Sequence, residues 1–219
     1  MSIAITLAPD LAARVRLGIA VIEGVTVRAS DPALAAEIAT AAAGLRTQHE
    51  GAASGDVPGV EEARTLYKAF GIDPTKTRPS NEALLRRVLK GDALYTVNTL
   101  VDALNLSSVR EQVPFGLYDL GRVQLPVELR RGRPGESYEG IRKAAVNVEG
   151  RPVLSDAQGA FGNPTSDSAR TMITLETRSA LVIAYAPATA AARLQAVLER
   201  TAATLMRYSG GTLSELRVQ

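Results

Sequence analysis

Cysteine is absent from this chain of 219 residues, and so is tryptophan. Without a thiol the protein has no disulfide, no thiolate zinc site and no cysteine nucleophile. Histidine occurs once, as His49 in a glycine-rich loop, so the several imidazoles of a histidine zinc shell are missing. A Ser-His-Asp triad would have to bring this one residue to a serine elsewhere in the chain. We therefore expect no metal site, and we interpret His49 as a solvated loop residue.

Glycine-rich phosphate loops are missing as well. No G-x-x-x-x-G-K-[ST] motif occurs, and no G-x-G-x-x-G motif follows a predicted strand. Aromatic residues make up 4% of the chain, so platforms on which nucleic-acid bases could stack are scarce. These absences exclude the usual kinase and dehydrogenase patterns, and we expect no cofactor.

Long apolar runs and a strong net charge are also lacking. No stretch reaches membrane-spanning length, and the start of the chain has no signal-peptide pattern. The 25 basic and 23 acidic residues nearly cancel, so the chain as a whole predicts no strong electrostatic partner. We expect a cytoplasmic protein without membrane contact. The oligomeric state does not follow from these features.

The residues that are present predict one α+β domain over residues 1–219, with a mixed β-sheet layered with helices. Hydrophobic residues account for 46% of the chain, enough for a substantial core. The N-terminal half predicts a strand over 16–27 that turns near Gly24, followed by helices. Their expected positions are 32–43 with a stop at Gly44, 58–71, and two segments on either side of Gly91. Short β-rich runs follow between 113 and 186, and a long amphipathic helix lies within 188–211.

A polar triplet lies on one face of the predicted helix that begins near Val97. Asn98, Asp102 and Asn105 are spaced by four and three residues, which places them side by side. Two interpretations remain open for them. They bind a polar ligand, or they hold the neighbouring "PFGLYDL" segment in place.

The segment "GNPTSDSARTMIT", residues 162–174, combines an acid, a guanidinium and several hydroxyls without histidine or cysteine. Asp167, Ser168, Arg170 and Thr171 are close enough to form an Asp-capped turn, which requires no ligand. In "RPGESYEG", Glu136 and Tyr138 follow a turn and either reach a cleft mouth or are ordinary turn residues.

The densest basic stretch also has two interpretations. It comprises Arg130, Arg131 and Arg133, with Arg142 and Lys143 nearby. These side chains could contact a phosphate backbone. Alternatively, they protect a solvated strand edge from pairing with another strand.

Five ordered motifs give the chain a family resemblance. They are "TRPSNEALLRRVLKG", "VNTLVDALNLSSV", "VPFGLYDLGRV", "GESYEG" and "SDSARTMITLETRSALVIAY". In this order they resemble the free-standing proteins of the B3/B4 family, which are similar to the B3/B4 domain of the bacterial phenylalanyl-tRNA synthetase β-subunit. The best-matched core spans about residues 76–190.

This resemblance implies a fold that encloses a pocket in which mischarged aminoacyl-tRNA is hydrolysed. An aminoacyl ester is already activated, so orienting a water molecule and stabilising the oxyanion can suffice. We assign catalytic roles to Asp102, Asp167, Arg170 and Thr171. We assign substrate binding to the remaining matched or nearby polar residues, which are Asn98, Asn105, Tyr118, Asp119, Glu136 and Ser168. The histidine that meets the tyrosine hydroxyl in the synthetase has no counterpart in the matching segments.

We therefore expect a tRNA-binding, editing-like domain whose partner is tRNA or aminoacyl-tRNA. The alternative is a non-catalytic module on the same fold that binds a free amino acid or a small polar metabolite. The near-neutral charge favours this alternative, because tRNA contact normally needs a basic surface. The tRNA hypothesis requires Arg130, Arg131 and Arg133, or Arg86 and Arg87, at the rim of the pocket. A structural or regulatory adaptor is a third hypothesis, favoured if the pocket is filled by its own side chains.

Overall fold

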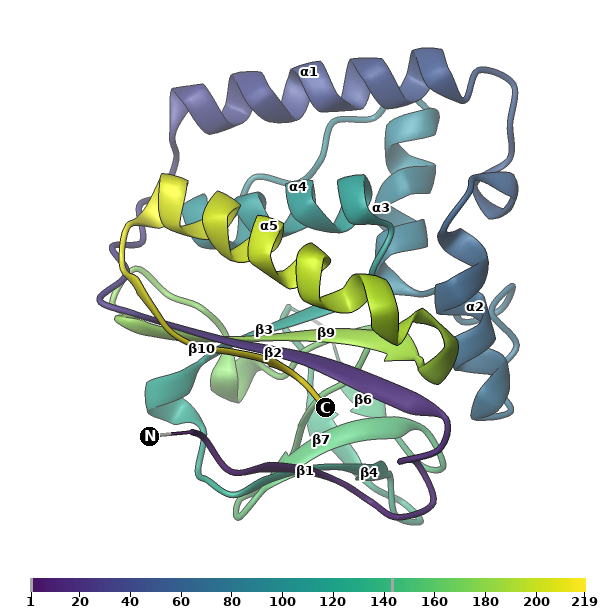
Figure 1. Ribbon diagram of the computed structural model, residues 1–219, viewed down its shortest axis with the longest axis vertical. Coiled ribbons are helices and arrows are strands. Elements are labelled where there is room, and N and C mark those ends of the chain that lie inside the picture. Colours follow the sequence, from purple (N-terminus) through teal and green to yellow (C-terminus); the bar gives the residue numbers. More distant parts are fainter. Residues whose placement is uncertain (1, 143) are drawn as a thin grey trace.

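The computed structural model describes residues 2–142 and 144–219 and arranges them in three layers, one of helices and two of sheet (Figure 1). The described residues form five α-helices, which are α1 (Pro32–Gln48), α2 (Val60–Ala69), α3 (Ser80–Leu89), α4 (Thr99–Glu111) and α5 (Ala191–Ser209). Helices α2 and α3 stand at one end of the helical layer (Figure 1). The molecule is therefore an α+β fold, as the sequence predicts.

The middle layer is an antiparallel sheet of four strands in the order β10-β2-β9-β3. Their bounds are β2 (Val15–Glu23), β3 (Phe115–Asp119), β9 (Ser179–Pro187) and β10 (Thr212–Val218). The outer layer has the order β1-β4-β7-β8 and is mixed, because β1 runs parallel to β4. Its strands are β1 (Ile5–Leu7), β4 (Val127–Arg131), β7 (Pro152–Asp156) and β8 (Gly159–Gly162), and a separate pair joins β5 (Ser137–Glu139) to β6 (Ala145–Asn147).

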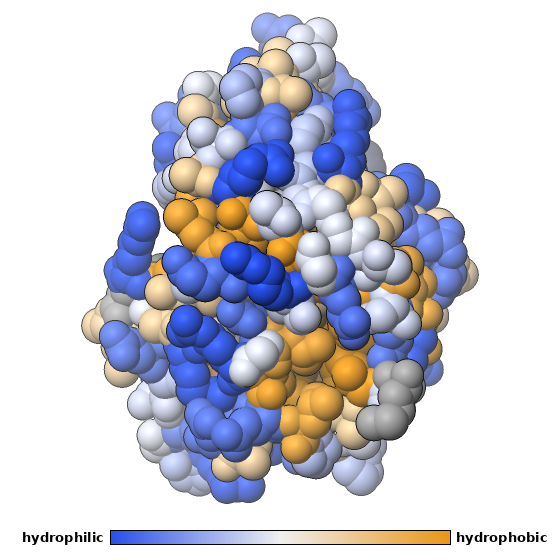
Figure 2. All heavy atoms as spheres, turned by 90° about the vertical axis from the view of Figure 1, so that its left-hand side faces the viewer, coloured by the Kyte–Doolittle hydropathy of each residue, from blue (hydrophilic) through white to orange (hydrophobic). Residues whose placement is uncertain are grey.

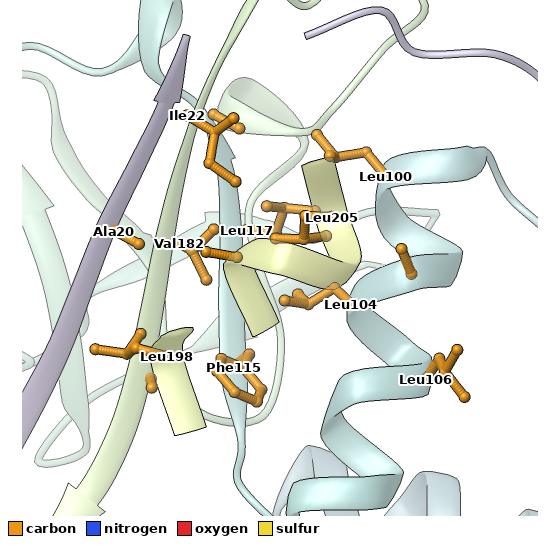
Figure 3. Packing of buried hydrophobic residues seen from close by; sticks show 14 of the residues in the cluster. Ala20, Ile22, Leu100, Leu104, Leu106, Phe115, Leu117, Val182, Leu198 and Leu205 are labelled. Atoms are coloured by element: carbon orange, nitrogen blue, oxygen red, sulfur yellow. The ribbon is translucent and has the colours of Figure 1, made fainter. Parts of the chain in front are cut away.

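Alternation along the middle strands explains why this sheet is buried on both faces. On β9, Val182 faces the helices, whereas Leu181 and Ile183 face the outer sheet. Successive side chains of a strand point to opposite faces, so an unbroken apolar run supplies two cores at once. On the helix side, residues of α4 and α5 such as Leu104 and Leu205 pack against Phe115 and Leu117 of β3 (Figure 3).

Two glycines were expected to mark a turn or an end, Gly24 the turn of a strand and Gly44 the end of a helix. Strand β2 ends at Glu23, directly before Gly24, whose φ of 72° is a conformation that suits glycine. The turn expected near Gly24 is confirmed, whereas the expected continuation of the strand to residue 27 is wrong. The helix expected to stop at Gly44 is wrong at its end, because α1 continues to Gln48. Alanines precede Gly44, nothing crowds it, and the helix ends where the His49 N–H bonds to the Leu45 carbonyl.

Three further differences concern strands. The "PFGLYDL" segment, which was not among the strands expected from sequence, contains β3 at the edge of the middle sheet. The β-rich run expected from Thr171 begins as a strand only at Ser179, because Thr174 and Thr177 form a turn through two mutual hydrogen bonds. The last strand, β10, has no counterpart among the predicted elements, although it pairs with β2.

Candidate functional site

A cavity of about 1010 Å³ lies between α4, the edge strand β3, the start of α3 and two loop segments. Helix α4 contributes one side of its cylinder through Asn98, Val101, Asn105 and Ser108, spaced by three and four residues. Asn98 caps this helix, because its side-chain oxygen accepts the Val101 N–H at 3.0 Å. The side-chain amide of Asn105 forms no hydrogen bond within the described part of the chain, so it is available to a ligand.

The floor of the cavity is apolar and continues the core between the helices and the middle sheet. Leu104, Phe115, Leu117 and Ile173 belong both to the cavity lining and to that core. Side chains held by a packed core keep their positions when a ligand leaves. The cavity can therefore offer a fixed apolar surface to the side chain of a ligand.

Opposite α4, residues 163–167 form a polar wall. Asn163, Thr165, Ser166 and Asp167 all line the cavity. The Asn163 side-chain oxygen accepts the backbone N–H groups of Thr165 at 2.7 Å and Ser166 at 2.9 Å, which folds the segment into a tight turn. The wall is thus a turn whose shape its first residue determines.

Buried tyrosines hold this wall from behind. The Tyr67 hydroxyl lies 2.6 Å from Thr165 Oγ1, the Tyr138 hydroxyl donates to the Ser166 carbonyl at 2.5 Å, and the Tyr118 hydroxyl donates to Asp167 Oδ1 at 2.8 Å. A fourth hydroxyl, that of Tyr185, lies 3.0 Å from that of Tyr118. Burial raises the pKa of all four phenols, so their hydroxyl groups keep their protons. Each residue from Thr165 to Asp167 thus has its own phenolic partner.

The Tyr118 ring leaves no room for a side chain on either flank. A Cβ atom at Gly116 would lie 2.1 Å from the Tyr118 hydroxyl oxygen, and one at Gly162 would lie 2.2 Å from it. Phe161 packs edge-on against the same ring, with centroids 5.0 Å apart. Tyr118 therefore occupies a fixed position behind Asp167.

The mouth of the cavity is both charged and apolar. Glu139, Arg142 and Glu176 line it together with Val97, Ile141 and Leu175. The last three are among the exposed large apolar side chains of the protein. Apolar residues also gather in patches separated by hydrophilic ones on the face shown in Figure 2.

Three of the residues that the sequence predicted for the site meet at this cavity. Asn98, Asn105 and Asp167 all line it, although about 70 positions of sequence separate the ends of the set. Asp102, to which the sequence assigned a catalytic role in the same pocket, is not among the residues that line this cavity. Its carboxylate accepts the Val97 N–H at 2.9 Å.

Asp102 lines a second cavity of about 380 Å³ between α1 and residues 91–96. Burial raises the pKa of the Asp102 carboxyl, against the effect of the hydrogen bond from Val97. Its contact ties the segment before α4 to the helix, and not the "PFGLYDL" segment that the structural interpretation of the polar triplet named.

Glu136, Ser168 and Arg170 lie together at a third, shallow cavity of about 480 Å³. Glu136 forms a bidentate pair with Arg130, with both contacts at 2.7 Å, and Arg130 lowers the pKa of the Glu136 carboxyl. Arg170 forms a bidentate pair with Asp156 at 2.9 and 3.0 Å. Ser168 caps a short 3₁₀ helix by accepting the Arg170 N–H at 3.1 Å. Partners within the protein thus engage all three side chains.

The remaining predicted residues line none of these three cavities. Tyr118 lies behind the wall, and Thr171 is fully buried. Asp119 accepts the Gly121 N–H at 3.0 Å and the Thr177 hydroxyl at 2.8 Å, which fixes the turn after β3. The catalytic and binding roles assigned to this whole set from sequence stay predictions.

The basic stretch is placed mostly away from the large cavity. Arg130 pairs with Glu136, and Arg131 pairs with Asp10 at 3.1 Å. Neither they nor Arg133 line the cavity, whereas Arg142 does. Lys143 lies outside the described residues.

Sequence reasoning missed several residues of the lining. Among them are Glu139, Asn163, Thr165, Ser166, Met172 and Thr174. All of them except Glu139 belong to the polar segment 162–174, from which the sequence named only Asp167, Ser168, Arg170 and Thr171. Within residues 2–142 and 144–219, no group of three His, Asp or Glu side chains is placed to hold a metal. No helix of the described residues is long and apolar enough to cross a membrane.

Comparison with known proteins gives one family match. The B3/4 domain family matches residues 62–211, a span that contains every residue of the large cavity's lining except Ala29. No curated protein matches the chain. Among solved structures that match is an N-terminal fragment of the phenylalanyl-tRNA synthetase β-subunit from Pyrococcus horikoshii, with 13% sequence identity and a TM-score of 0.47. The similarity covers 93% of this chain and 49% of that one, so the chain spans about half the length of the fragment.

Proposed function

The chain belongs to the B3/4 domain family, and from this premise we propose that its large cavity binds an aminoacyl group carried on the 3′ end of a tRNA. The amino-acid side chain lies on the apolar floor of Leu104, Phe115 and Leu117, and the polar atoms of the ester face the wall of residues 163–167. The main support for the proposal is that three separate phenols hold this wall in one conformation. Preorganised polar groups beside an apolar surface are typical of small-molecule sites.

The size of the cavity favours an aminoacyl group with its ribose over a free amino acid. Ligand sites for drug-sized molecules have volumes of about 300–1,000 Å³, and this cavity has about 1010 Å³. A free amino acid would leave much of that space to water. The free amino acid is the competing ligand.

Calorimetric titration with three ligands tests the proposal. The ligands are a free amino acid, its amide, and the same amino acid joined by a stable amide to 3′-amino-3′-deoxyadenosine. We expect the affinity to rise in that order, because each addition fills more of the cavity. Tightest binding by the free amino acid would instead establish the metabolite-binding alternative.

Asn105→Ala is the variant that links this binding to the cavity. The Asn105 amide has no partner among the described residues, and alanine has a higher helix propensity. The variant should therefore keep its thermal stability and bind the nucleoside amide about fivefold more weakly, the loss of one hydrogen bond. Gln195→Ala on α5, whose side chain bonds to Glu199 at the surface, is the matched control and should bind like the parent protein.

Hydrolysis of the bound ester is a second candidate function, favoured by the position of Asp167. It is the one residue of the expected catalytic set that lines the cavity, and Tyr118 orients its carboxylate. We expect Asp167→Asn to lower deacylation of a mischarged tRNA by about a hundredfold, which equals about 2.7 kcal/mol. His49→Ala should leave the rate unchanged, because His49 ends α1 outside the cavity. A loss of hydrolysis in the His49 variant would overturn this mechanism.

A further inference from the structure

Tyr95 differs from the other aromatic residues that carry an arginine over the ring. The described residues form four such pairs, with Arg87 over Tyr95, Arg131 over Phe70, Arg170 over Phe161 and Arg207 over Tyr208. The rings of Phe70, Phe161 and Tyr208 are buried, whereas Tyr95 is 58% exposed. Tyr95 therefore still offers an aromatic surface to another molecule.

The Arg87–Tyr95 pair lies beside the mouth of the large cavity. Ser80 and Leu84 of α3 line the cavity, and Arg87 continues the same helical stripe at a spacing of three residues. Tyr95 precedes Val97, a residue of the cavity lining, by two positions. A ligand that leaves the cavity along this side meets the pair next.

Arg87 also fixes the shape of the loop that carries Tyr95. Its guanidinium stands 4.3 Å from the centre of the ring, and its Nε donates to the Ala93 carbonyl. One terminal nitrogen reaches the Tyr95 hydroxyl at 3.4 Å. The ring is therefore held in place before any ligand arrives, which lowers the entropic cost of stacking on it.

Basic and acidic side chains both lie near Tyr95. The basic ones are Arg87 over the ring, Arg46 in the lining of the second cavity, and the exposed Arg86 and Lys90 in the last turn and at the C-terminal cap of α3. The acids of the second cavity are Asp92, Asp102, which accepts the Val97 N–H, and Asp31, which is paired with Arg28 at 2.7 Å. An exposed aromatic ring among cations is the arrangement that binds single-stranded nucleic acid, through base stacking and phosphate contacts.

We propose that Tyr95 and Arg87 bind the unpaired 3′ end of an RNA, with the terminal base stacked on the Tyr95 ring and the adjoining phosphates against Arg87 and its neighbouring cations. This inference rests on the proposed function, because it names the part of the aminoacyl-tRNA ligand that lies outside the cavity. The pair thus serves as a subsite for the nucleotide, separate from the wall that faces the aminoacyl group.

Fluorescence anisotropy with a labelled RNA tetranucleotide, ACCA, tests the stacking contact. A second probe has the same backbone but lacks the terminal base. The parent protein should bind the complete probe about tenfold more tightly than the abasic one. Tyr95→Leu should bind both equally, and Tyr95→Phe should restore the difference, because it keeps the ring. Thermal unfolding of each variant shows whether the fold is retained.

Salt dependence separates the phosphate contact from the stacking contact. For single strands, each phosphate contact adds about −0.7 to the slope of the logarithm of the binding constant against the logarithm of salt concentration. Arg87→Gln should make the slope shallower by about one such contact. Arg207→Gln is the matched control, because it removes an arginine from a ring that is only 5% exposed, and it should not change the slope.

Two results would overturn the subsite. They are equal binding of both probes by the parent protein, and a base preference that survives in Tyr95→Leu. The amino-acid amide has no base, so its binding reports on the proposed function independently. Amide binding without RNA binding rejects the subsite alone, and RNA binding without amide binding rejects the aminoacyl function.

Discussion

Residues 163–167 and 168–171 are neighbours in sequence and similar in composition, yet their polar side chains serve different cavities. The first group lines the large cavity and is held by the hydroxyls of buried tyrosines. In the second group only Ala169 reaches the large cavity, whereas Ser168 and Arg170 line the shallow third cavity and Arg170 is paired with the buried Asp156. We call them the inner and the outer segment. What separates them is the partner of each side chain, which composition does not reveal.

This difference assigns separate tasks to the two segments. In the inner segment the partners reach the wall from behind, so its polar groups are fixed where they face the cavity. In the outer segment Ser168 and Arg170 form structural contacts with their own side chains, so neither remains for a ligand in the large cavity. The hydroxyl of Thr171 is buried and has no hydrogen-bond partner among the described residues. Changes in the inner segment should affect binding, and changes in the outer segment should affect stability.

Gly162→Ala should have the largest effect, because it should impair both stability and binding. The new methyl group would lie 2.2 Å from the Tyr118 hydroxyl oxygen, and Tyr118 is fully buried and cannot move away. We expect a loss of about 3 kcal/mol in the free energy of unfolding, together with loss of cavity binding. Urea unfolding and calorimetry measure the two effects. Gly44→Ala in the open middle of α1 is the control and should stabilise by about 0.5–1 kcal/mol. Equal behaviour of the two variants would contradict the role of Tyr118.

Arg170→Ala should have the next largest effect, on stability alone. It leaves the wholly buried Asp156 side chain without its bidentate partner. Because the Arg170 side chain is partly exposed, we expect a cost of about 2 kcal/mol, below the range for a fully buried pair. Ligand binding in the large cavity should be unchanged once the fraction of folded protein is matched. Weaker binding at unchanged stability would return Arg170 to the binding site.

Glu136→Gln should change how the stability of the protein depends on pH. Arg130 lowers the pKa of the Glu136 carboxyl in the folded state, so the pair stabilises the protein above the ordinary glutamate pKa. This contribution disappears as the pH falls through the lowered value. The variant should lose about 1 kcal/mol near neutral pH and equal the parent protein in strong acid. Unfolding curves from pH 7 downward measure the difference, and a constant difference across this range would exclude the ionic origin.

Ser168→Ala should give the smallest effect. Its hydroxyl caps one turn of 3₁₀ helix through the Arg170 N–H, and such caps contribute about 0.5–1 kcal/mol. Binding in the cavity should not change, because Ser168 lies on the outer side. A thermal shift assay with and without the nucleoside amide measures both quantities. Equal melting temperatures for variant and parent would show that the cap contributes nothing.

Local patterns in the sequence identify much of the fold, because they depend on neighbours along the chain. The strand that turns at Gly24 and the amphipathic α5 follow from such patterns. The pairing of β10 with β2 and the edge position of β3 depend on distant partners, so no local pattern indicates them. The helix spacing likewise indicated correctly that Asn98 and Asn105 share a face, but it did not show that Asp102 turns to Val97.

For the candidate site, the sequence indicated a segment that contributes to the cavity better than it indicated the individual side chains. Residues 162–174 contain an unusual density of polar groups, and much of the large cavity is built from them. Which of them face the cavity depends on Tyr67, Tyr118 and Tyr138, which lie between about 25 and 100 positions away in sequence. Contacts over such long sequence separations can be identified only in the folded structure.

The cluster of phenols behind the wall also supplies an optical reporter. The chain has six tyrosines and no tryptophan, so its ultraviolet emission comes from tyrosine alone. Four of the six, Tyr67, Tyr118, Tyr138 and Tyr185, form this cluster, within hydrogen-bonding distance of the wall or of one another. A ligand that moves Asp167 or Ser166 changes the surroundings of these fluorophores, so binding can be followed without any label. Because burial raises the pKa of all four, their phenolate absorbance in alkali marks the opening of the wall itself.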